Sequence, residues 1–143
     1  MRINDVLKAK PSSDVFTISP DASVRELVEL LSDHNVGALI VSTDGETVAG
    51  IVSERDVVRR LREDGGVLDQ PVASIMTADV HTCAAGDALN DLMQVMTEHR
   101  IRHVPVVQDG RLTGIISIGD VVKNRIGELE FERDQLDHYV HQT

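Results

Sequence analysis

Short apolar runs alternate with amphipathic helical stretches along the whole chain. Between residues 24 and 31 the apolar side chains recur at spacings of three and four, which predicts a helix with one buried face. Apolar runs of four to six residues lie on both sides of this helix and predict short strands. Through residue 64 the expected elements are an apolar lead-in at 3–7, a strand at 15–18, a helix at 24–34, strands at 36–41 and 48–52, and a helix at 56–63.

The same order of elements returns in the second half of the chain. Residues 114–122 repeat residues 50–58 at six of nine positions, with an offset of 64. Upstream of this segment the matches continue at an offset of 65, because Thr47 has no counterpart in the second copy. This self-similarity indicates two homologous units. The second unit is expected to contain a lead-in at 72–76, a strand at 80–83, a helix at 87–98, strands at 104–107 and 112–117, and a helix from 120 onward.

The repeat predicts an α/β fold of the α+β type with two pseudo-symmetric units, residues 3–64 and 72–126. Each unit would combine a short lead-in, a small mixed sheet and two packing helices. Gly65 and Gly66 break the helix that ends the first unit, so the segment that follows them is expected to be a short linker. Because neither unit alone can bury both faces of its sheet, we expect the two units to pack together across a pseudo-twofold axis.

The last predicted helix continues beyond the repeat as a tail over residues 127–143. Its residues at alternating spacings of three and four form a seam that is apolar apart from one arginine. This seam consists of Ile126, Leu129, Arg133, Leu136 and Val140. Two heptads fit either a solvated helical tail or a contact between two copies of the chain, and both interpretations stay open.

Composition and charge restrict the kinds of partner. With 143 residues and 41% hydrophobic residues the chain suffices for one compact domain or two small half-domains that share a core. A formal net charge of −10 argues against nucleic acid or an anionic membrane as the main partner. The single cysteine, Cys83, cannot form an internal disulfide, and no apolar run approaches the length of about 18 residues that spans a bilayer. These features predict a cytoplasmic protein.

The repeated motif places a Ser and an Asp at each predicted junction between a strand and a helix. The pairs are Ser53 with Asp56 and Ser117 with Asp120. A Ser followed three residues later by an acidic residue is typical of a helix cap. A hydroxyl and a carboxylate beside a helix N-terminus also suit the diol and phosphate of a nucleotide. The repetition of the pair favours the second interpretation.

Together these residues resemble the family of tandem CBS domains, often called Bateman modules. The family pattern of Gly, two hydrophobic residues, Ser or Thr, two residues and Asp is met at 50–56 and again at 114–120. The basic and apolar segment that precedes the hairpin in this family is met at 102–106. The resemblance covers nearly the whole chain and leaves only about the last fifteen residues outside.

The resemblance implies a regulatory protein that binds AMP, ADP, ATP or a related adenosyl ligand in two clefts between the repeats. It further implies a homodimer that signals to a partner protein that the sequence does not identify. The implied ribose acceptors are Asp56 and Asp120, with Ser53 and Ser117 near the ribose and phosphate and Arg102 and His103 at the phosphates. Backbone groups near the base would come from Asp14, Val15 and Phe16 and from Asp79, Val80 and His81.

The two copies differ at the positions implied for phosphate contact. The first unit has Gly37 and Ala38 where the second has Arg102 and His103. We therefore expect the Ser53 and Asp56 cleft to lack the basic pair, with Arg55 compensating in part, and we expect the Ser117 and Asp120 cleft to be the phosphate site.

No catalytic constellation is evident in the sequence. It contains neither a phosphate-binding glycine loop with Lys nor a dinucleotide fingerprint, so we expect a non-enzymatic protein that requires no cofactor. Zinc binding is one alternative, although the spacing of the candidate ligands fits neither a zinc finger nor a ribbon. These candidates are His81, Cys83, His99 and His103. A scaffold with empty clefts is the other alternative, because a fold does not by itself establish a ligand.

Overall fold

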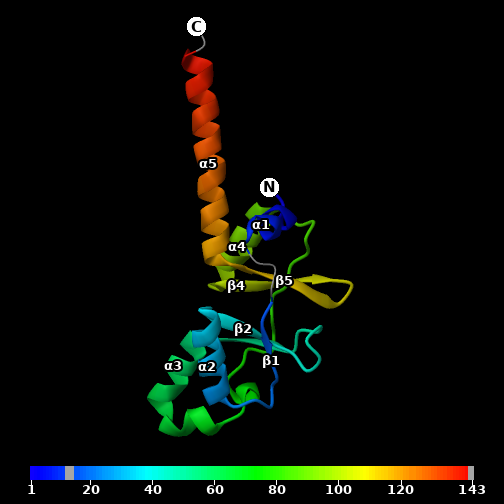
Figure 1. The fold of residues 1–143 in the computed structure, drawn as a ribbon, viewed down its shortest axis with the longest axis vertical. Helices are drawn as coiled ribbons and strands as arrows, with labels where there is room; N and C mark the ends of the chain where they lie inside the picture. Colours follow the sequence, from blue (N-terminus) through cyan, green and yellow to red (C-terminus); the bar gives the residue numbers. More distant parts are fainter. Residues whose placement is uncertain (12–14, 142–143) are drawn as a thin grey trace.

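The computed structural model describes residues 1–11 and 15–141, which form two small sheets, each with its own set of helices (Figure 1). This arrangement confirms the predicted α+β class. The elements of the first half are α1 (Ile3–Ala9), β1 (Thr17–Ile18), α2 (Val24–His34), β2 (Ala38–Val41), β3 (Gly50–Ser53) and α3 (Glu54–Glu63). They are followed by the 3-10 helices η1 (Gly65–Asp69) and η2 (Val72–Ser74), then α4 (Leu89–His99), β4 (His103–Gln108), β5 (Arg111–Ser117) and α5 (Ile118–His141).

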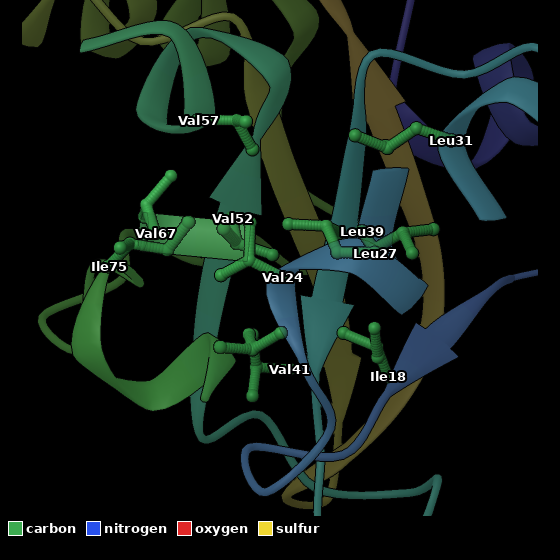
Figure 2. Close-up of a cluster of buried hydrophobic side chains, with 11 residues drawn as sticks. Ile18, Val24, Leu27, Leu31, Leu39, Val41, Val52, Val57, Val67 and Ile75 are labelled. Carbon is green, nitrogen blue, oxygen red and sulfur yellow. The ribbon is translucent and has the colours of Figure 1, made fainter. Parts of the chain in front are cut away.

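The first sheet is mixed, as predicted, with strand order β1-β2-β3. β1 pairs parallel to β2, with Thr17 opposite Ile40, and β2 pairs antiparallel to β3, with Leu39 opposite Val52. All four residues of β2 are buried, because this central strand lies under α2 on one side and faces the second repeat on the other. Figure 2 shows the aliphatic cluster that results, in which β2 and β3 side chains meet those of α2, α3 and the linker.

In the part of the chain that the structure describes, the second sheet consists of β4 and β5, so the strand predicted at 80–83 is wrong. Cys83 alone bridges to Val106. Its N–H donates to the Pro105 carbonyl at 3.0 Å, and its carbonyl accepts from the Val107 N–H at 2.9 Å. The chain then turns at once, because the Asp87 carboxylate accepts a bond from the Ala84 N–H at 2.9 Å, and no ladder can extend.

The two hairpins that were predicted from Asp-Gly pairs close in different ways. In the second hairpin, Asp109 and Gly110 have φ of 53° and 78°, as a two-residue type I′ turn requires. In the first hairpin only Gly45 has a positive φ, and the loop is wider. The Asp44 carboxylate organises that loop by accepting bonds from the N–H groups of Glu46 and Thr47, each at 2.8 Å. These bonds lower the pKa of Asp44 to about 2.

The lead-in segments of the two halves are exchanged between the cores. Ile3 and Val6 of α1 are fully buried in the cluster formed by α4, β4 and β5. In return, Val72 and Ile75 of the second lead-in are buried in the cluster of the first sheet. Each core therefore depends on residues from the other half of the chain, so the two repeats are interlocked.

The ends of the helices follow from their caps. α3 begins at Glu54, two residues earlier than predicted, because Ser53 is its N-cap. α2 ends where Asn35 takes the left-handed conformation, which delays β2 to Ala38. None of the helices in the described part of the chain is long and apolar enough to cross a bilayer.

Candidate functional site

An open cleft of about 410 Å³ lies between the two repeats. Its walls come from the junctions between a strand and a helix that the repeated motif forms, one from each half. From the first half it is lined by Gly37, Ala38, Ile51, Ser53, Glu54, Arg55, Asp56 and Arg59. From the rest of the chain it is lined by Thr77, Arg100, Ile101, Arg102, His103, Ser117, Ile118 and Gly119.

At the first junction, Ser53 and Asp56 form a capping box. The Ser53 N–H donates to Asp56 Oδ2 at 2.8 Å and the Ser53 hydroxyl donates to the same oxygen at 3.1 Å. The Asp56 N–H contacts Ser53 Oγ at 3.4 Å. None of these bonds uses Oδ1 of Asp56, so this carboxylate can cap α3 and still offer an acceptor to a ligand. Capping and ligand binding are therefore compatible roles for the pair.

At the second junction the same capping box is joined by a lysine. The Ser117 N–H donates to Asp120 Oδ2 at 2.9 Å, and Lys10 Nζ lies 3.0 Å from that oxygen. Lys10 also donates to the Ile115 carbonyl at 2.9 Å. Burial alone would raise the pKa of Asp120, but the bonds from Ser117 and Lys10 outweigh it, and the pKa is lowered. Asp120 does not line the cleft, so the two junctions are no longer equivalent.

The basic pair of the second repeat faces the first repeat across the same cleft. A Cβ placed on Gly37 would lie 3.7 Å from Cε1 of His103, so the imidazole packs against this glycine. Arg102 and His103 thus share the cleft with Ser53 and Asp56. The expectation that the Asp56 cleft lacks the basic pair is wrong, because the residues that replace it, Gly37 among them, leave room for the pair to reach in from the other repeat.

Four arginines line this cleft. They are Arg55, Arg59, Arg100 and Arg102. Among the residues that the structure describes, no carboxylate lies within 4.0 Å of any of their guanidinium groups. Arg59 and Arg100 were not among the predicted site residues. The basic run from His99 to His103, which stands out in an acidic chain, was an available signal for Arg100.

The charge of the cleft depends on whether His103 is protonated. Burial of the ring is the main reason why the pKa of His103 is lowered from its ordinary value of 6.5. Lys10 and Arg102 lower this pKa further, whereas Asp120 and Glu54 act in the opposite direction. The imidazole is therefore neutral near pH 7, and an anion in the cleft would favour its protonation.

The family model for the CBS domain matches residues 3–63 and 72–127. The chain is also 36% identical over 146 residues to the mitochondrial CBS domain-containing protein CBSX3 of Arabidopsis thaliana, with 96% of this chain and 71% of that protein covered. The chain belongs to the CBS-domain family. The resemblance inferred from the repeated motif is thereby confirmed.

Two solved structures of CBS-domain proteins show the same fold. The CBS-domain protein ATU1752 of Agrobacterium tumefaciens is 43% identical, with a TM-score of 0.83 and coverage of 87% of this chain and 99% of that one. The CBS-domain protein PAE2072 of Pyrobaculum aerophilum, solved in complex with AMP, is 28% identical, with a TM-score of 0.74. That match covers 84% of this chain and 89% of the Pyrobaculum chain.

The residues expected near the base do not line the cleft of this CBS pair. Phe16 stacks on His34 with ring centroids 3.7 Å apart, and the equivalent His81 lies against His99 at 4.1 Å. These contacts repeat at matching positions in the two halves. The other residues of this group lie outside the cleft as well, namely Val15, Asp79 and Val80, whereas Asp14 lies outside the described residues.

The four candidate zinc ligands do not form one cluster, although His81 and His99 lie side by side. Within the described part of the chain, no group of three or more His, Cys, Asp or Glu side chains could hold a metal ion. Cys83 is a poor ligand in its own right, because burial raises the pKa of its thiol to about 12 and a metal binds the thiolate. The geometry therefore gives the zinc alternative no support.

Proposed function

We propose that this CBS pair is a regulatory, non-catalytic protein that binds adenine nucleotides, either AMP, ADP or ATP, in the cleft between its repeats. Occupancy of the cleft would be read by a partner protein that contacts the module. The observation that carries the proposal is that an acceptor for the ribose hydroxyls and a group of cations line the same cleft. The acceptor is Asp56, and the cations are Arg55, Arg59, Arg100 and Arg102.

Each part of a nucleotide has a matching surface in this cleft. The ribose diol can donate to Oδ1 of Asp56, which the capping box leaves unused. Guanidinium groups bind phosphate through paired, charge-assisted hydrogen bonds, which are stronger than neutral ones. The aliphatic side chains of Ile51, Ile101 and Ile118 provide apolar surface against which a base can lie.

A regulatory role fits the state of the hydroxyl groups in the cleft better than a catalytic one. The Ser53 hydroxyl donates to Asp56, and Ser117 Oγ accepts the Asp120 N–H at 3.1 Å. Each hydroxyl thus serves a helix cap, and within the described residues neither is hydrogen-bonded to a histidine or lysine side chain of the kind that activates a nucleophile. The AMP complex of the Pyrobaculum CBS protein supports an adenosine ligand for this fold.

The number of phosphates should set the order of affinity. Four arginines exceed what a single phosphate needs, so ATP is expected to bind more tightly than ADP, and ADP more tightly than AMP. Asp120 does not line this cleft and its Oδ2 is paired with Lys10, so the ribose of a nucleotide in this cleft is assigned to Asp56.

A thermal-shift panel tests the proposal. A ligand that binds only the folded state raises the melting temperature, so saturating AMP, ADP and ATP should raise it in that order of increasing effect. NAD and S-adenosylmethionine complete the panel as other adenosyl ligands. If none of the five compounds raised the melting temperature, the scaffold with empty clefts would be the better account.

A further inference from the structure

The second half of α5 lies outside both hydrophobic cores. The helix has 24 residues, which corresponds to about 36 Å, and its C-terminal half extends beyond every other element (Figure 1). Every residue from 129 to 141 is exposed. A helical segment of this length is marginal in water without tertiary contacts. Another surface is therefore needed to hold this part of α5 in helical form.

One face of α5 carries a continuous seam of aliphatic residues. Val122, Ile126, Leu129 and Leu136 lie at heptad positions, with Arg133 as the one charged member between them. Ile126 and Leu129 are about half exposed, at 50% and 49%, and Leu136 is 65% exposed. Single exposed apolar residues are ordinary, but a seam of them along one helix face marks an interaction surface.

The N-terminal end of this seam opens into a shallow hollow of about 640 Å³. Three aliphatic side chains, those of Ile118, Val122 and Ile126, contribute to its lining. The hollow also borders the nucleotide cleft, because Arg102, Ile118 and Gly119 line both. An apolar side chain from a partner could therefore be buried at the base of α5.

The charges of α5 are divided between its two ends. Lys123 and Arg125 lie before residue 127, whereas the segment 128–137 holds five carboxylates and a single cation, Arg133. Two such helices packed in parallel would place Arg133 against Arg133. Packed antiparallel, each helix brings its basic end to the acidic end of the other, which is favourable for both pairs of ends.

We propose that the seam of α5 is the docking surface for α5 of a second copy of this chain, packed antiparallel. In this register Ile126 lies opposite Leu136 of the partner subunit, Lys123 opposite Asp137 of the partner subunit, and Arg133 opposite Leu129 of the partner subunit. Glu130 and Glu132 meet their own counterparts near the centre, where Arg133 of each chain supplies a compensating cation. The C-terminal end of the partner helix then covers the hollow beside the nucleotide cleft.

Disulfide trapping tests the direction of packing. Ile126→Cys and Leu136→Cys are made as separate chains, each with Cys83→Ser, then mixed in equal amounts and oxidised gently. The intact masses of the products identify which chains have joined. The proposal predicts that the mixed disulfide between positions 126 and 136 predominates. Disulfides of 126 with 126 and of 136 with 136 in place of the mixed product, or no disulfide-linked product, would overturn it.

A pair of matched variants tests whether the seam holds the copies together. Leu136 and Phe131 are each 65% exposed on α5, but only Leu136 belongs to the seam. Light scattering should show that Leu136→Glu halves the mass of the particle, whereas Phe131→Glu leaves it unchanged. Equal masses for the two variants would overturn the proposal. Circular dichroism of both variants checks that the fold is retained.

Discussion

The arginines of the cleft show how an acidic chain can accept an anionic ligand. The formal net charge is −10, yet four of the fourteen Lys and Arg residues line this one cleft. The four arginines outnumber the two carboxylates that line the same cleft, those of Glu54 and Asp56, so the local charge is positive, and low-dielectric walls focus its field. The net charge argues against nucleic acid or an anionic membrane as the main partner, but it does not describe the charge inside a single cleft.

The sequence could predict some of these residues and not others. Ser53 and Asp56 form a local pair at a spacing of three, so the sequence alone determines the geometry of their capping box. Arg59 and Arg100 come from different repeats, and their meeting depends on how the two halves pack. The same holds for Lys10, which reaches Asp120 over more than a hundred residues of chain. Pairs of residues close in sequence could therefore be predicted, whereas the meeting of residues from distant parts of the chain could not.

The lowered pKa of His103 predicts a pH dependence for stability. An unfolded chain takes up a proton on this histidine near pH 6.5, whereas the folded protein does so only at lower pH. The unfolded state therefore binds more protons as the pH falls below about 6.5, and the free energy of unfolding should decrease. His103→Gln should reduce this decrease, measured by urea unfolding at pH 7.5 and pH 5.5.

The same histidine predicts proton uptake when a phosphate binds. A phosphate near the ring favours its protonated form, so ATP binding at pH 6.5 should take up protons. Calorimetry in two buffers of different ionisation enthalpy measures this uptake. His103→Gln should remove most of it, whereas His141→Gln, at the exposed end of α5, should not. Identical uptake in both variants would show that His103 does not face the phosphates.

Among the elements, the hairpin strands and the amphipathic helices were the predictable ones. Their apolar runs, Asp-Gly turns and caps are local signals, and only their ends moved by a few residues. The strand expected at 80–83 failed because pairing with β4 stops after one bridge, and this depends on the turn that Asp87 forms. The placement of α1 in the second core is a long-range contact with no signal in the local pattern.

Gly50 at the start of β3 is required by a close backbone approach. A Cβ at this position would lie 2.8 Å from the Thr77 carbonyl oxygen, which is held by its own bond from the Ile51 N–H at 2.9 Å. Gly50→Ala should therefore destabilise the fold by about 1 to 3 kcal/mol, as overpacking of a tight contact does. Urea unfolding measures the loss.

Gly86→Ala is the matched control for this substitution, because a Cβ at Gly86 would meet no atom within 4 Å. Its unfolding midpoint should stay close to that of the parent protein. Equal midpoints for the two variants would mean that the approach of Thr77 to β3 is not a tight one.

At the scale of the whole molecule, the exchange of lead-in segments joins the two repeats into one unit. α1 completes the second core and the segment after α3 completes the first, so neither half can unfold without exposing part of the other core. A ligand that contacts both repeats should therefore stabilise the entire protein in a single transition. Under the proposed function, this linkage would convert nucleotide binding into a change of the whole module.

The most direct test of the central claim compares ATP with adenosine on Arg102→Ala by titration calorimetry. Loss of a charged hydrogen bond costs about 1.5 to 3 kcal/mol, so the dissociation constant for ATP should rise more than about tenfold. Adenosine, which has no phosphate, should bind as it does to the parent protein. Arg62→Ala, on α3 but outside the cleft, should change neither affinity. If Arg102→Ala left ATP binding intact, or weakened ATP and adenosine equally, the assignment of the phosphates to this cleft would be contradicted.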